Sequence, residues 1–170
     1  MAALVAAVLL FGPAAQARAQ VEERGSGFWY GGDGGYAQVE LVNCIACDPA
    51  GLPFGAVRLG GRIGASMLDG AELGLAGRAA QHPSIASLIG TVTVYPVRRS
   101  GAHIRLGLGL LGRGAYSNVD GLAMPALLGG AGYDIRVSEA MSVVPSVSAI
   151  IGPGAYATNL VRVGIGLTGH

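Results

Sequence analysis

The chain contains little charge and no lysine: charged residues make up 12% of its 170 residues, and all 11 basic residues are arginine. A soluble domain typically carries about 25% charged residues, so this composition is unusual for a surface exposed to water. After residue 19, no run approaches the ~18 continuous apolar residues of a membrane helix. Without Arg18, the remaining arginines equal the 10 acidic residues, and no basic patch indicates nucleic-acid binding.

Residues 1–19 have the anatomy of an export signal. An apolar stretch over residues 2–11 is followed by the breaker pair Gly12-Pro13 and by the small-residue site Ala17-Arg18-Ala19. No basic residue precedes the apolar stretch, and a buried N-terminal helix is the alternative interpretation. We predict that the signal is cleaved and that residues 20–170 form one domain.

Short segments in which apolar residues alternate with polar residues or glycine fill the remaining chain. In residues 56–67, Val57, Leu59 and Ile63 share one face, and Arg58 and Arg62 share the other. A transmembrane strand needs only about 9–11 residues, so this pattern predicts an all-β fold, an eight-stranded antiparallel up-and-down transmembrane β-barrel. The predicted strands cover residues 28–41, 56–67, 72–78, 88–97, 103–114, 124–136, 142–149 and 160–168.

Three local irregularities are expected within this pattern. The Asp69-Gly70 pair predicts a tight hairpin over residues 68–71, because it supplies the positive φ of a type I′ turn. Asp33 and Gln38 have opposite parity, so a bulge at Gly34-Gly35 would let both point inward. Pro145 has no N–H to give to a ladder, which predicts a second bulge within its strand.

The opening segment Phe28-Trp29-Tyr30-Gly31-Gly32 and the closing segment 160–170, together with the export signal, resemble the small outer-membrane β-barrel family. These are the eight-stranded porin-like proteins of Gram-negative envelopes. Members commonly end on an aromatic residue that the barrel-assembly machinery recognises, whereas this chain ends on His170. The resemblance implies location in the cell outer membrane, contact with its lipid and lipopolysaccharide, and insertion by that machinery. Family roles range over passive permeation, envelope integrity and surface adhesion to an unidentified ligand.

Aromatic residues are expected to form girdles at both membrane interfaces. With the N-terminus on the periplasmic side, the predicted inner girdle contains Phe28, Trp29, Tyr30, Tyr95 and Tyr133, and the outer girdle contains Phe54, Tyr116 and Tyr156. Tyr36 fits neither girdle. The alternative is that these side chains are scattered core residues.

The inward faces of the predicted strands carry a candidate lumen charge network. It comprises Arg58, Arg62, Arg78, Arg105, Arg113, Arg136 and Arg162 together with Glu40, Glu72 and Asp134. Eight strands leave an interior that side chains can fill, and opposite charges held there should pair. We therefore expect a closed or barely conducting lumen. An excess of arginine that creates an anion-preferring path is the alternative.

Cys44 and Cys47 lie in the longest predicted outer loop, residues 42–55. Exported proteins meet an oxidising compartment, so we predict a local disulfide between them. Redox catalysis would need the pair at a helix N-terminus, and a metal site would need ligands beyond His82 on a neighbouring loop. Two unpaired thiols are the remaining alternative.

Two segments are candidates for an enzyme site, because some eight-stranded barrels are lipid A deacylases that use a His, a Ser and an acid. His82-Pro83-Ser84 lacks the Asn that follows in that family, and Tyr116-Ser117-Asn118 lacks the His. No acid accompanies either segment. Residues 107–112 spell GxGxxG, but strand alternation continues through them. We predict no enzyme, catalytic residue, metal or cofactor; a deacylase-like enzyme and a soluble lipocalin-like lipid-binding barrel remain alternatives.

Overall fold

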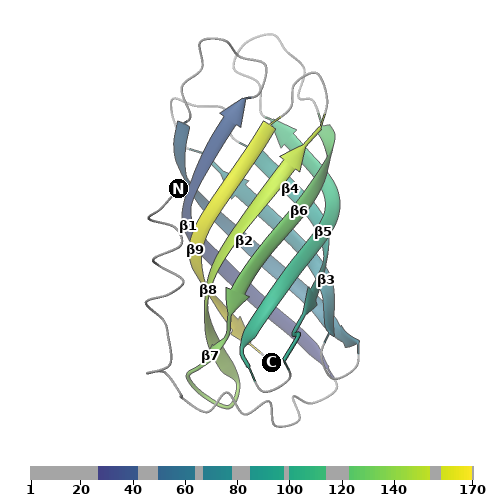
Figure 1. Cartoon of the computed structure of the whole chain (residues 1–170), viewed down its shortest axis with the longest axis vertical. Coiled ribbons are helices and arrows are strands. Elements are labelled where there is room, and N and C mark those ends of the chain that lie inside the picture. Colours follow the sequence, from purple (N-terminus) through teal and green to yellow (C-terminus); the bar gives the residue numbers. More distant parts are fainter. Residues whose placement is uncertain are drawn as a thin grey trace.

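The computed structural model describes residues 27–41, 50–63, 67–77, 85–97, 100–113, 123–153 and 158–169. The strand segments are β1 (Phe28–Leu41), β2 (Ala50–Ile63), β3 (Met67–Ala76), β4 (Ile85–Val94), β5 (Ala102–Arg113), β6 (Ala123–Tyr133), β7 (Ile135–Arg136), β8 (Met141–Gly152) and β9 (Thr158–Gly169). Every pairing is antiparallel, and β1 pairs with both β2 and β9. The sheet therefore closes into a barrel whose strands are tilted relative to its axis (Figure 1). Within these ranges, no helix has the length and hydropathy needed to cross a membrane.

The barrel has eight strands because β6 and β7 are two parts of one strand. β8 pairs with β6 up to Gly132 opposite Ser146 and resumes with β7 at Ile135 opposite Val143, without any change of register. At the interruption, the backbone N–H of Asp134 donates instead to the carbonyl of Gly101, at 2.9 Å. The predicted fold class, an eight-stranded antiparallel barrel, is therefore confirmed.

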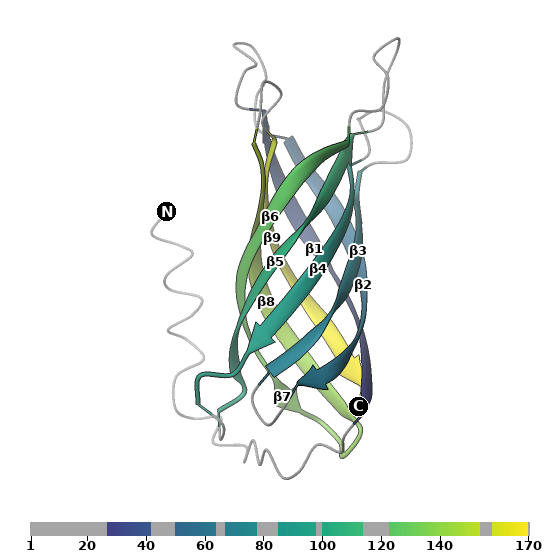
Figure 2. The ribbon, with the colours of Figure 1, turned by 90° about the vertical axis from the view of Figure 1, so that its right-hand side faces the viewer.

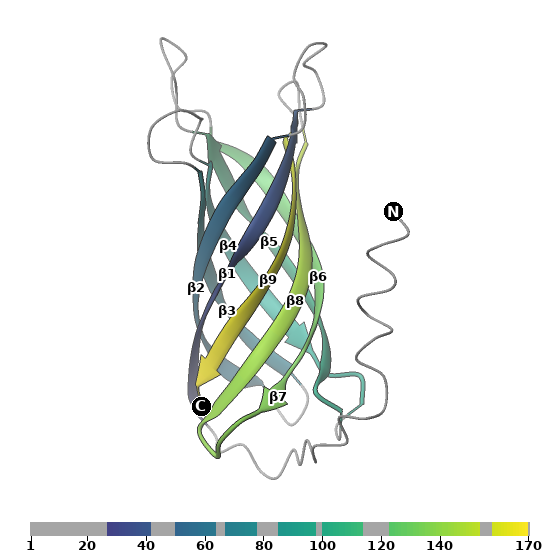
Figure 3. The same cartoon turned by 90° about the vertical axis from the view of Figure 1, so that its left-hand side faces the viewer.

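The two ends of the barrel differ in what they carry. We call the end where β1 begins and β9 ends the turn end; it also holds the connections over residues 64–66, 95–101 and 137–140. The opposite, loop end joins the strands through residues 42–49, 77–84, 114–122 and 153–157. Figures 2 and 3 show the strands running between these ends, with β7 at the turn end beside β8.

Side chains alternate between the two faces of the barrel wall as the sequence predicts. In β4, buried residues alternate with exposed ones along almost the whole strand. Leu75, Leu108 and Ile165 point outward and are 61%, 69% and 64% exposed, whereas Glu72 on the inner face is 0% exposed. The outer surface is therefore apolar, and the charged side chains lie inside.

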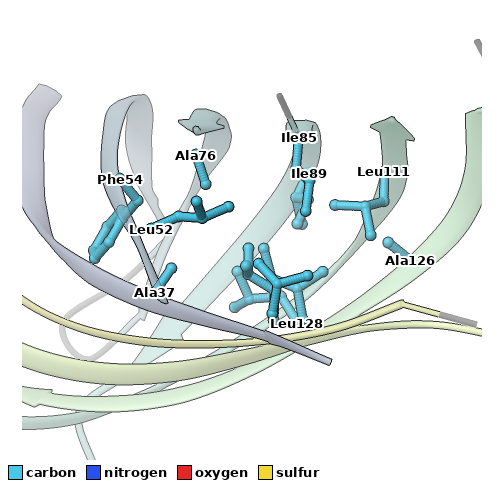
Figure 4. Packing of buried hydrophobic residues seen from close by; sticks show 12 residues of the cluster. Ala37, Leu52, Phe54, Ala76, Ile85, Ile89, Leu111, Ala126 and Leu128 are labelled. Carbon is cyan, nitrogen blue, oxygen red and sulfur yellow. The ribbon is translucent and has the colours of Figure 1, made fainter. Parts of the chain in front are cut away.

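A hydrophobic core fills the half of the lumen next to the loop end. It consists of Ala37, Val39, Leu52, Phe54, Ala76, Ile85, Ile89, Leu111, Ala126, Leu128, Ile150 and Leu160, with Met124 packed against it. Figure 4 shows members from β1 to β6 pointing into one shared interior. We call these residues the apolar plug, which was not predicted from the sequence.

Two predicted boundaries are wrong. β2 begins at Ala50 rather than Ala56, so Leu52-Pro53 belongs to the barrel wall instead of a loop. The Asp69-Gly70 pair lies inside β3, opposite Gly61 and Gly60, and the connection falls at residues 64–66. The ladder between β2 and β3 therefore overrides the local hairpin signal.

Neither predicted bulge is present. The pairing of β1 with β2 and β9 runs through Gly34 and Gly35 without an extra residue, so the side chain of Gln38 points outward. At Pro145, the ladder toward β6 and β7 is interrupted with equal numbers of residues on both sides. The missing N–H is accommodated by a gap in the hydrogen bonding rather than by an inserted residue.

Candidate functional site in the barrel lumen

On the turn-end side of the apolar plug, five buried charged side chains meet across the lumen. Asp33 comes from β1, Arg58 from β2, Glu72 from β3, Arg105 from β5 and Arg162 from β9. We call this group the lumen ion network. Each side chain is at most 4% exposed, so each charge needs partners within the barrel.

Glu72 holds two arginines at once. Its Oε1 lies 2.6 Å from Arg162 Nη1, and its Oε2 accepts a hydrogen bond from Arg105 Nη1 at 3.2 Å. Hydrogen bonds between charged groups are roughly twice as strong as neutral ones, and burial strengthens them further. Glu72 therefore ties β3 to β5 and β9, which are not its neighbours in the sheet.

Asp33 completes the network from β1. Its Oδ1 lies 2.8 Å from Arg58 Nε, an ion pair without the alignment of a hydrogen bond, and its Oδ2 lies 3.9 Å from Arg105 Nη1. Asp33 was absent from the predicted network. Its odd numbering, shared with the buried Trp29 and Ala37, is the sequence signal that would have placed it inside.

Arg162 joins the lumen ion network to its surroundings. Its Nε donates to Ser148 Oγ at 3.0 Å, and its Cζ lies 5.3 Å from the centre of the Phe54 ring. Phe54 belongs to the apolar plug, so a cation–π contact connects the charged layer to the apolar one. The two layers follow one another directly along the lumen.

The buried charges of the described residues balance. Three arginines (Arg58, Arg105, Arg162) and three carboxylates (Asp33, Glu72, Asp134) are buried. The arginine excess that would favour an anion path is therefore absent from this buried set.

A second polar cluster, formed by Tyr95, His103 and Asp134, lies near the turn end, and we call it the turn-end polar cluster. Asp134 Oδ2 accepts a hydrogen bond from Tyr95 Oη at 2.7 Å, and Asp134 Oδ1 lies 3.3 Å from His103 Nδ1. The rings of Tyr95 and His103 are 5.3 Å apart between centres. These contacts hold the interrupted strand β6–β7 to β5 and to the residue that follows β4. Of the three residues, only Asp134 was predicted from the sequence to belong to the lumen charge network.

Trp29 fills the lumen beside this cluster and packs with Leu68 and Tyr95. Its Nε1 donates to the carbonyls of Gly61 and Asp69, at 3.2 and 3.0 Å. A Cβ on Gly60 would lie 2.6 Å from that nitrogen, so the absence of a side chain at this position makes room for the indole.

Three further members of the predicted network, Arg62, Glu40 and Arg136, lie within the described residues. Arg62 is half-buried on the inner face of β2. Glu40 is exposed, because β1 has no bulge and Glu40 lies on the same outer face as Tyr36 and Gln38. The prediction that Glu40 faces inward is wrong. Arg136 is also exposed, because the chain turns directly after β7; its guanidinium donates to the carbonyls of Ser138 and Glu139, both at 3.1 Å.

Several predicted residues lie outside the part of the chain that the structure describes. These are Arg78, the Arg113 side chain, Cys44, Cys47, residues 82–84 and residues 116–118. The disulfide therefore stays a prediction, and the deacylase-like segments stay an alternative. In the described ranges, no three His, Cys, Asp or Glu side chains are grouped to hold a metal ion.

The predicted aromatic girdles are only partly correct. Phe28, Tyr30 and Tyr133 point outward near the turn end, but Trp29, Tyr95 and Phe54 are buried inside the lumen, at 4%, 8% and 8% exposed. Tyr36 points outward, and its hydroxyl lies over Gly51 at the start of β2, so it reaches the loop end. Tyr116 and Tyr156 lie outside the described residues.

Comparison with known proteins gives structural matches alone: no family model and no curated protein matches the chain. Neisserial surface protein A matches with a TM-score of 0.68 and 12% identity, over 85% of this chain and 97% of that one. Ail, the attachment invasion locus protein of Yersinia pestis, solved with the heparin analogue sucrose octasulfate, matches with a TM-score of 0.52 and 11% identity, over 83% and 98%. The chain therefore has the fold of the small eight-stranded outer-membrane β-barrels.

Proposed function

We propose that this chain is an integral outer-membrane protein with a sealed barrel, which serves envelope structure or surface attachment rather than solute permeation or catalysis. In this proposal the export signal over residues 1–19 is removed, the barrel-assembly machinery inserts residues 20–170, and the turn end faces the periplasm. Membrane lipid and lipopolysaccharide are then its permanent partners.

The observation that carries the membrane location is the reversed polarity of the barrel. Arg105 and Arg162 are 4% and 2% exposed, whereas Leu106 and Val163, their neighbours in sequence, are 58% and 49% exposed. In water, such an outer surface would expose far more contiguous apolar area than soluble proteins tolerate. A hydrocarbon environment makes the same arrangement favourable, and it opposes the lipocalin-like alternative, whose apolar face would point inward.

The filled lumen favours a role other than permeation. A solute would have to pass both the lumen ion network and the apolar plug, whose members Ile89 and Ile150 are 0% exposed. Breaking buried ion pairs and opening a close-packed core are both costly. A role in surface attachment draws its support from the shared fold, since Ail is named for attachment and was solved with a heparin analogue.

Site-directed labels test the membrane location. In a C44S/C47S background, a polarity-sensitive label at position 106 or 163 in a reconstituted barrel is expected to report acyl chains. A label at position 97 in the turn-end connection, where Val97 is 59% exposed, is the matched control and should report the aqueous interface. A report of bulk water from position 106 or 163 would overturn the membrane location.

Planar-bilayer recording tests the sealed lumen independently. The purified, folded protein is expected to give no discrete conductance steps, while a known open porin in the same bilayers gives them. Reproducible channels that disappear when the protein is heat-denatured would overturn the sealed barrel and would leave the membrane location intact.

A further inference from the structure

A small cavity lies between the lumen ion network and the turn-end polar cluster. Its volume is about 10 Å³, and its wall includes Arg58 from the network and His103 and Asp134 from the cluster. Thr93 and Thr168 add hydroxyl groups to the same wall. The volume corresponds to about one water-sized sphere, roughly 10–15 Å³.

Arg58 lines this cavity and carries an unsatisfied donor. Its side chain is 4% exposed, and its Nη2 has no hydrogen-bond partner among the described residues. A buried donor without a partner costs about 1–3 kcal/mol, and more when it is charged. A ligand with an acceptor atom in the cavity would remove that cost.

The charges in the wall decide which ligand fits. Asp134 carries a carboxylate that would repel a bare anion, and Arg58 carries a guanidinium that would repel a bare cation. A neutral molecule that both accepts and donates hydrogen bonds satisfies both groups. Among such molecules, the volume admits only water.

We propose that this cavity is a binding site for one ordered water molecule, which accepts from Arg58 and donates to Asp134 or to a threonine hydroxyl. The water joins the two polar clusters into one continuous hydrogen-bonded network on the turn-end side of the apolar plug. The lumen is then hydrated from the turn end as far as the lumen ion network and dry beyond it. This inference goes beyond the proposed function, because it holds for the folded barrel in any amphiphile.

Crystallography of the folded barrel in detergent tests the site directly. We expect electron density within hydrogen-bond distance of Arg58 Nη2 and of an oxygen of Asp134, Thr93 or Thr168. Crystals grown in bromide should give no anomalous peak there. Absence of density in well-ordered wild-type crystals, or an anomalous bromide peak in the cavity, overturns the proposal.

A pair of variants at one lining residue gives a second measurement in solution. Thr93→Val removes a hydroxyl at nearly constant volume, whereas Thr93→Ile also fills part of the cavity. If water occupies the site, Thr93→Ile displaces it and leaves Arg58 unsatisfied, so its urea midpoint falls below that of Thr93→Val. A midpoint at or above that of Thr93→Val means that the cavity is dry, which overturns the proposal.

Discussion

Arg162 Nη1 lies 2.6 Å from Glu72 Oε1, and the two side chains are 3% and 0% exposed. Glu72 belongs to β3 and Arg162 to β9, which are separated in the sheet by β2 and β1. Their contact therefore crosses the lumen instead of following the wall. Because Glu72 also accepts from Arg105, a single carboxylate pairs with guanidinium groups from two distant strands.

The substitution Glu72→Gln should strongly destabilise the barrel. It leaves Arg105 and Arg162 buried with one fewer negative charge between them, and removing one partner of a buried pair costs about 3–5 kcal/mol. Urea unfolding of the refolded barrel in micelles, followed by the emission of its single tryptophan, measures the loss.

Asp69→Asn supplies the matched control, because Asp69 lies on the outer face of the same strand and is only half-buried. Its effect on the unfolding free energy should be much smaller than that of Glu72→Gln. Equal losses in the two variants would contradict the central role given to Glu72.

The energetic cost of an arginine on the outer surface should depend on depth. Leu106 lies in the middle of β5 and is 58% exposed, whereas Val97 lies in the turn-end connection and is 59% exposed. In vesicles, Leu106→Arg should cost about 2–4 kcal/mol and Val97→Arg about 0–1 kcal/mol, because only the first side chain meets the bilayer centre. Equilibrium unfolding from vesicles gives both values, and similar costs would contradict a membrane-spanning β5.

Strict alternation made much of the wall predictable from sequence. In β5, the outward Ile104, Leu106 and Leu108 and the inward Arg105 follow one rule, which needs no knowledge of other strands. Where local signals competed with the ladder, prediction failed. The turn propensity of Asp69-Gly70 stabilises a turn less than continuous pairing with β2 stabilises the strand, and so these residues remain in a strand.

The contents of the lumen were less predictable, because contacts across a barrel join strands that are distant in sequence. Phe54 was assigned to the outer girdle within the predicted loop over residues 42–55, yet β2 starts before it and turns its ring inward. Asp33 was left out of the predicted network, although it lies on the inner face of β1. The pairing of Glu72 with Arg162 rather than with Arg58, its partner across the ladder, depends on side-chain reach that no single strand encodes.

The apolar plug should behave as a close-packed core. Ile89 belongs to this core and is 0% exposed, so Ile89→Ala should cost about 2–5 kcal/mol through lost burial and the cavity left behind. Leu88→Ala is the control, because Leu88 is 56% exposed on the outer face, where detergent or lipid tails can fill the space. Urea midpoints of the two variants decide the matter. A loose or hydrated loop-end lumen would give similar small losses.

Two glycine substitutions should separate steric need from simple tolerance. A Cβ on Gly60 would lie 1.9 Å from the Asp69 carbonyl oxygen and 2.6 Å from Trp29 Nε1, whereas one on Gly129 would meet nothing within 4 Å. Overpacking costs typically about 1–3 kcal/mol, so Gly60→Ala should lower the unfolding free energy by that amount and Gly129→Ala should leave it nearly unchanged.

The emission of Trp29 reports the same difference locally, because it is the only tryptophan. Its indole is 4% exposed and held by the carbonyls of Gly61 and Asp69, so displacement by a new methyl group should shift its emission to longer wavelength. Gly129→Ala should keep the wild-type spectrum, since nothing links that outward position to the indole. An unshifted spectrum in a folded Gly60→Ala barrel would mean that the indole does not occupy the space above Gly60.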